Sequence, residues 1–195
     1  MNKITKDNDP DKTVLVWIGR FSSRSGYGKA TRDYFSAVEH RFRGLGISCV
    51  GIDSQKMRLI GDQSLVNFDA RSDRATIRFA EHCRVHVIYH ETAQNFPRLQ
   101  TKGKVRFYGL TVHEFSEMIS GSIDALSFVD HLLVPSRWNK QLLIENGFAA
   151  DFADVIPHIV NVPSSAAVES SEAKVSSAKC AFLLIVSNIE RKNVS

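Results

Sequence analysis

The sequence predicts an α/β fold, a Rossmann-like doubly wound parallel sheet, from two observations. The first is the apolar run at residues 13–19, which is bounded by turn residues and has the pattern of a buried strand. The second is the alternation of such runs with segments of helical periodicity over about 150 residues. That alternation is typical of an open sheet with helices on both faces.

The first three predicted elements form a βαβ unit. A loop at residues 20–28 leads into a helix at 29–44, where apolar residues recur three and four positions apart. Gly44 and Gly46 stand where the end of a helix favours glycine, and a second strand follows at 47–53. Strand, helix and strand in this order imply parallel pairing through a right-handed crossover.

The chain beyond residue 53 continues to alternate, although less regularly. Ser136 is a good N-cap for the last predicted helix, and Gly147 follows the end of that helix. The predicted strands lie at 64–68, 85–89, 105–111, 132–135 and 154–157, and the predicted helices lie at 74–83, 115–129 and 137–146.

Composition indicates a folded protein of the cytoplasm. The chain has 195 residues, of which 43% are hydrophobic and 24% are charged, so disorder, collagen and coiled coil fit poorly. It has no apolar run of about 18 residues that would span a membrane, and its N-terminus has no signal-peptide pattern. The three cysteines are dispersed, which does not suggest a disulfide framework. A net charge of +4 is too small to indicate nucleic acid, and we expect no such partner.

Four segments divide the chain. Residues 1–12 are polar and predicted to be disordered, and residues 13–161 form the Rossmann-like domain. Residues 162–179 are rich in Ser, Ala, Glu and Lys and have the composition of a linker. Residues 180–195 begin with another buried-type strand that has no partner, so we expect them to be the start of a second, incomplete domain.

The glycine-containing loop is the first candidate site. Gly26, Tyr27 and Gly28 lie between the first strand and the first helix, at a carboxyl strand end where ligands of open α/β sheets bind. The glycines let a ligand approach the backbone, and a helix N-terminus attracts anions. The segment is neither a Walker A motif nor a full dinucleotide fingerprint. The alternative is a tight turn without a ligand.

Histidines at two further strand ends are the second candidate. His113 follows the strand at 105–111 and is able to donate to a phosphate or a sugar hydroxyl, although a structural histidine is the alternative. His90 and Glu91 end the neighbouring strand, and we expect them to line the same cleft. His86 stands about 13 Å from His90 along that strand, too far to share one metal. We expect no metal.

Basic residues gather around the first helix. They favour either contact with an anionic membrane surface or a solvated helix face, of which the second is the commoner. A membrane contact would place the protein at the inner face of the membrane. The residues are Arg24, Lys29, Arg32, Arg41 and Arg43.

Five segments in order resemble a known family. They are residues 14–34, Thr-Val-His-Glu at 111–114, Val-Pro-Ser-Arg-Trp-Asn from 134 onward, Val-Ile-Pro-His at 155–158, and 182–193 with its Glu-Arg-Lys-Asn. Together they resemble the nucleotide-sugar glycosyltransferases of family 4, which are retaining enzymes of the GT-B group. The Pro-Ser-x-Trp-Asn and Arg-Lys-Asn segments are the most specific.

The resemblance implies an acceptor-side domain facing a domain that binds the nucleotide sugar. The transferred sugar would pass with retention to a glycan or a lipid-linked acceptor, without metal or other cofactor. The family's paired glutamates belong to the second domain and are missing from this sequence, so the chain alone is expected to be inactive. The resemblance implies a catalytic His113, donor contacts from Gly26, Tyr27, Gly28, Arg191 and Lys192, and a cleft lined by His90, Glu91, Ser136 and His158.

Two other functions fit the fold. One is a non-catalytic module that binds a nucleotide or a sugar. The other is a Rossmann dehydrogenase, which the incomplete glycine fingerprint disfavours.

Overall fold

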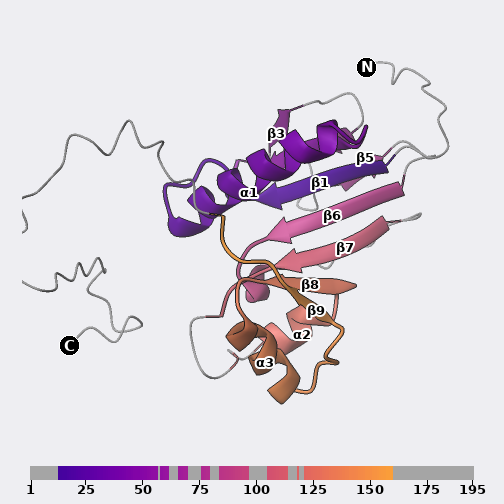
Figure 1. Ribbon diagram of the computed structural model, residues 1–195. Coiled ribbons are helices and arrows are strands. Elements are labelled where there is room, and N and C mark those ends of the chain that lie inside the picture. Colours follow the sequence, from indigo (N-terminus) through magenta and orange to yellow (C-terminus); the bar gives the residue numbers. More distant parts are fainter. Residues whose placement is uncertain are drawn as a thin grey trace, which may run out of the picture. The chain divides into compact units, whose positions relative to one another are not determined.

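The computed structural model describes most of the first 159 residues (Figure 1). The chain divides into two units, residues 1–159 and residues 160–195, and all of the described residues belong to the first. The predicted N-terminal segment, linker and second-domain strand lie outside the described residues, as do Arg191 and Lys192. The described residues are 13–56, 58–61, 66–69, 76–79, 84–96, 105–113, 118 and 121–159.

A seven-stranded sheet confirms the predicted fold class. Its order is β3-β2-β1-β6-β7-β8-β9, and every pairing from β2 to β9 is parallel, whereas β3 is antiparallel to β2 at one edge. The strands are β1 (Thr13–Gly19), β2 (Ser48–Asp53), β3 (Arg58–Gly61), β6 (Arg84–His90), β7 (Val105–Leu110), β8 (His131–Val134) and β9 (Ala153–Val155).

The direction in which strands are added reverses between β1 and β6. The chain passes from β1 to β2 on one side of β1 and later returns to place β6 on its other side. In sheets of this kind ligands bind outside the carboxyl ends of the strands at such a reversal. The arrowheads of β1, β6 and β7 in Figure 1 lie at the sheet edge where helix α1 (Gly26–Arg43) begins.

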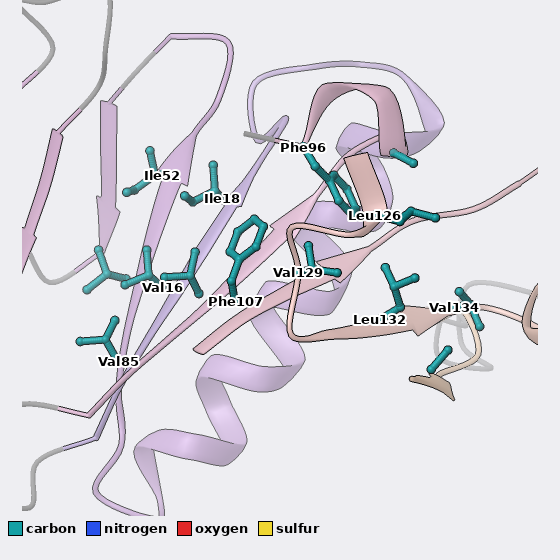
Figure 2. Close-up of a cluster of buried hydrophobic side chains, with 14 of the residues drawn as sticks. Val16, Ile18, Ile52, Val85, Phe96, Phe107, Leu126, Val129, Leu132 and Val134 are labelled. Carbon is teal, nitrogen blue, oxygen red and sulfur yellow. The ribbon is translucent and has the colours of Figure 1, made fainter. Parts of the chain in front are cut away.

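Helices cover both faces of the sheet. Side chains of β1 point alternately to the two faces, and each face packs in its own hydrophobic cluster with residues of the helices. Leu15 and Trp17 pack with Tyr34 and Phe35 of α1. The other face of β1 packs in a larger cluster that includes Leu126 of α2 (Ser122–Leu126), which Figure 2 shows. Leu143 of α3 (Arg137–Glu145) belongs to the same cluster. Members of this second cluster that are less than 2% exposed include Val14, Val16, Val50, Ile52, Leu126, Leu132, Val134 and Leu143.

Local capping signals set the ends of the two longest helices. Ser136 caps α3, since its side chain accepts a hydrogen bond from the Asn139 N–H, as the sequence predicted. Gly46 and Gly147 follow α1 and α3 with φ of 73° and 91°, a left-handed conformation that favours glycine.

The first predicted helix begins three residues earlier than expected. Ser25 is the N-cap of α1, because its side chain accepts a hydrogen bond from the Gly28 N–H at 3.3 Å. The helix therefore starts at Gly26 rather than at residue 29, and the two glycines lie in its first turn instead of in a loop. A capping serine decided the boundary, although glycine at both positions had favoured a turn.

Two other helix predictions were wrong. Within residues 74–83 the structure has a strand, β5 (Thr76–Phe79), which pairs antiparallel with β4 (Val66–Asp69). Pairing with β4 determines the conformation of this segment, so the predicted helix was wrong.

Within the predicted helix at 115–129, α2 covers only residues 122–126. Met118 lies outside any helix, and Gly121 has φ of 81°, which a continuous helix does not allow. The edge strand β3 and the short 3-10 helix η1 (Ala93–Asn95) were not predicted.

Candidate functional site

The reversal between β1 and β6 gathers most of the residues that the sequence singled out. Arg20 follows β1, while His90 ends β6 and Glu91 comes directly after it. Tyr27, in the first turn of α1, points its hydroxyl toward the carbonyl oxygen of Val112 beyond the end of β7, at 3.5 Å. Helix α1 thus connects three neighbouring strand ends.

His90 is a buried anchor of this edge. Its Nδ1 lies 3.1 Å from the Thr31 hydroxyl, and the rings of Trp17, Tyr27 and Tyr34 surround it with centroids 5.6–6.0 Å away. Burial, with a smaller contribution from the nearby His158, lowers the pKa of His90 to about 3. The imidazole is therefore neutral at physiological pH and serves the packing of α1 on the sheet.

Glu91 forms an ion pair with Arg20, a residue that the sequence analysis did not single out. The Nε–H of Arg20 donates to Glu91 Oε2, and the other carboxylate oxygen accepts the Thr92 N–H at 2.8 Å. The hydrogen bond to Glu91 is the main reason that the pKa of Arg20 is raised. The guanidinium also lies over the Tyr27 ring, 5.9 Å from its centroid. The sequence signal that could have identified Arg20 as a site residue is its position directly after the first strand.

The two glycines of α1 have different surroundings. A Cβ on Gly28 would lie only 2.1 Å from the Ser23 carbonyl oxygen, whereas a Cβ on Gly26 would meet nothing within 4 Å. The turn before α1 is held against the helix by Arg32, which donates to the carbonyl oxygens of Phe21 and Ser23 at 2.8 and 2.7 Å. Gly28 is therefore explained by close packing, and Gly26 leaves the helix N-terminus open to a ligand.

His113 lies beyond the end of β7 and is held through its backbone. Asn139 Nδ2 donates to the His113 carbonyl oxygen at 2.9 Å, while the Asn139 N–H donates to Ser136 Oγ at 3.1 Å. Ser136 thus supports His113 through Asn139, a residue that sequence reasoning had not assigned. The side chain of His113 is buried, and burial lowers its pKa. Its Nε2 has no hydrogen-bond partner among the residues that the structure describes.

His158 joins the segment after β9 to α1. Its Nδ1 lies 3.3 Å from the Tyr34 hydroxyl, which is also 2.9 Å from the Pro157 carbonyl oxygen and 3.2 Å from that of Ile156. Burial raises the pKa of Tyr34 to about 12. The predicted cleft residues His90 and His158 therefore both lie against the buried Tyr34 ring, with centroid distances of 5.7 and 6.0 Å.

Asp53 at the end of β2 is occupied by the backbone. Its carboxylate accepts the N–H groups of Ser22 at 2.9 Å and of Gln55 at 3.0 Å. Burial alone would raise the pKa of Asp53, but hydrogen bonds from Ser22, Gln55 and Lys56 outweigh burial and lower it. In dinucleotide-binding sheets an acidic residue after the second strand binds ribose. The engagement of Asp53 is a further argument against the dehydrogenase alternative.

The basic residues of α1 are exposed, and most have partners on the protein. Lys29 pairs with Asp33 and Arg43 with Glu39, both one helical turn apart, and Arg32 binds the turn before the helix. These pairs support the solvated-face interpretation. Contact with a membrane surface stays a prediction.

The described residues show neither a metal-ligand cluster nor a membrane-spanning helix. Within the described part of the chain, no group of three or more His, Cys, Asp or Glu side chains is placed to hold a metal ion. None of the described helices is long and apolar enough to cross a membrane. Comparisons of the chain with family models, with curated proteins and with solved structures found no match.

The two glycines provide a matched pair of substitutions. We expect Gly28→Ala to lower the free energy of unfolding by about 1–3 kcal/mol, because the new methyl group overlaps the Ser23 carbonyl. We expect Gly26→Ala to change it by no more than about 0.5 kcal/mol, since its Cβ enters open space. Urea unfolding of both variants measures the difference. Equal destabilisation would contradict the packing explanation of Gly28.

The burial of His90 predicts a loss of stability in acid. Its folded-state pKa of about 3 lies below the ordinary value of 6.5, so the unfolded chain binds the proton more readily. Stability from this source is present above the unfolded pKa and falls as the pH drops below it. Between pH 7 and pH 5 we expect the wild type to lose about 2 kcal/mol more than His90→Asn. Identical losses in denaturant unfolding would show that His90 binds its proton as readily in the folded protein as in the unfolded chain.

Proposed function

We propose that this chain is the acceptor-side part of a retaining glycosyltransferase that transfers a sugar from a nucleotide sugar to a glycan or lipid-linked acceptor. One observation carries the proposal. At the strand-order reversal and the neighbouring end of β7, the Nη groups of Arg20 and the Nε2 of His113 have no hydrogen-bond partner among the described residues, and Gly26 at the start of α1 is exposed. A cation, a helix N-terminus and a neutral imidazole are the groups that a sugar phosphate needs.

The reaction places a defined demand on these groups. The acceptor hydroxyl passes its proton to an oxygen of the departing nucleoside diphosphate and bonds to the anomeric carbon on the face from which that diphosphate leaves. The diphosphate leaves with the electron pair of the broken carbon–oxygen bond and accumulates negative charge. Donors fixed in place before the reaction stabilise that charge without metal. The N-terminus of α1, which begins at Gly26, supplies such donors.

His113 suits a contact with the sugar. Burial keeps its imidazole neutral near pH 7, so one ring nitrogen donates and the other accepts. An unpaired Nε2 in a buried ring is costly unless something binds it, and a sugar hydroxyl or phosphate oxygen supplies the missing partner. Asn139 and Ser136 hold the backbone of His113 in place for that contact. Arg191 and Lys192, which the resemblance assigns to the donor, lie outside the described residues.

A non-catalytic nucleotide- or sugar-binding module is the second candidate, and one observation favours it. His90 is buried and Glu91 is paired with Arg20, so both are committed to the structure. A binding module would hold its ligand at the same sheet edge, but it does not require a sugar beside His113.

Binding selectivity separates the two candidates. We expect the full chain to bind a member of a panel of uridine, guanosine and adenosine diphosphate sugars, with amide NMR shifts at Gly26, Tyr27 and Val112. His113→Ala should weaken binding of that nucleotide sugar by about two- to tenfold, the equivalent of one lost hydrogen bond, but leave the sugar-free nucleoside diphosphate unaffected.

The control is His86→Ala, on the same sheet but toward the amino end of β6, where His86 Nδ1 lies 3.1 Å from the Tyr108 hydroxyl. This variant should lose stability more than affinity. An equal affinity of wild type and His113→Ala for the nucleotide sugar would support the binding module. Shifts confined to the amino ends of the strands would contradict both candidates.

A further inference from the structure

We infer that Arg20 is a phosphate-binding residue that Glu91 positions at the reversal between β1 and β6. This inference rests on the proposed function, because it names the side chain that receives a phosphoryl group at the same sheet edge. It also stands on its own geometry, since a phosphate ion tests it without any sugar.

The ion pair leaves most of the guanidinium available. Arginine has five N–H donors, and Glu91 engages the one on Nε. Among the residues that the structure describes, no hydrogen bond to an Nη atom of Arg20 is found. The side chain of Arg20 is 30% exposed, whereas that of Glu91 is 6% exposed. The outer side of the guanidinium is therefore open to a ligand, while its inner side is fixed.

Glu91 is itself held in place and therefore fixes the orientation of the Arg20 guanidinium. Its second carboxylate oxygen accepts the Thr92 N–H, and its own backbone N–H donates to the Leu110 carbonyl oxygen at 3.2 Å. The Tyr27 ring confines the guanidinium from another direction. An arginine that is already oriented loses little freedom when it binds, and its paired Nη groups match two phosphate oxygens.

The surroundings select an anion. Arg20 leads into the turn that ends at the N-terminus of α1, and the first turn of this helix contains no acidic residue. Gly26 is exposed, and a Cβ there would meet nothing within 4 Å, so a ligand can approach the first residue of that turn. The nearby carboxylates, Asp53 and Glu91, are already bound by N–H donors. A phosphoryl group at this place would meet the guanidinium on one side and the helix dipole on the other.

The test is titration calorimetry of the full chain with inorganic pyrophosphate. We expect Arg20→Gln to weaken binding by about 10- to 100-fold, the range for a lost charge-assisted hydrogen bond. Arg24→Gln is the matched control, because Arg24 is an exposed neighbour in the same turn and its loss changes the net charge equally. This control should weaken binding by no more than about twofold. Arg20→Lys should recover only part of the loss, since lysine lacks the paired donors.

Positioning by Glu91 has its own readout. The Nε–H resonance of Arg20 in the wild type should move on addition of pyrophosphate, and Glu91→Gln should shift the same resonance before any ligand is added. Because this measurement uses the wild type and Glu91→Gln, it still tests the inference if Arg20→Gln fails to fold. A wild-type resonance that pyrophosphate does not move would overturn the inference.

The remaining outcomes are distinct. Equal weakening by Arg20→Gln and Arg24→Gln would show a general charge effect and refute a site at Arg20. No binding of pyrophosphate by the wild type up to about 10 mM would refute it as well. If pyrophosphate binds through Arg20 but no nucleotide sugar binds, the inference stands and the proposed glycosyltransferase function fails.

Discussion

Helix α1 approaches the carboxyl ends of β1 and β6 so closely that the rest of this edge depends on the contact. A Cβ on Gly19 would lie 2.8 Å from Thr31 Cγ2, and Thr31, which is fully buried, shares a hydrogen bond with His90. Glycine at the last position of β1 is what allows the helix to come this near. The same contact fixes how near α1 lies to the strand ends, while the Ser25 cap sets the residue at which the helix begins.

Most of the polar groups at this edge are used by the fold itself. Asp53 binds the turn, and Glu91 binds Arg20. Among the described residues, several groups on neighbouring elements remain: the Nη groups of Arg20, the exposed Gly26 at the start of α1, and the unpartnered side-chain atoms Trp17 Nε1, Thr111 Oγ1 and His113 Nε2. Buried or oriented polar groups without partners are where a ligand gains most, because it replaces contacts that the protein cannot make alone.

The sequence predicted the parts of the fold that depend on local signals. The apolar run of β1, the Ser136 cap and the turn at Gly147 were read correctly because neighbouring residues determine them. The helix predicted at 74–83 failed because β5 is stabilised by pairing with β4. Arg20 was missed for a similar reason, since its role comes from a carboxylate 71 positions away. His90 was found at the edge, but its burial comes from aromatic side chains of β1 and α1 that no spacing rule locates.

A crystal structure of the full chain with a bound nucleotide sugar would test the central claim most directly, namely that ligands bind at the strand-order reversal. A hollow of about 400 Å³ at the amino ends of β6 and β7, lined by Arg84, His86, Val105 and Arg106, offers cations at the opposite edge of the sheet. We expect the diphosphate between the guanidinium of Arg20 and the first turn of α1, with the sugar near His113. A diphosphate seated against Arg84 and Arg106 would contradict this account.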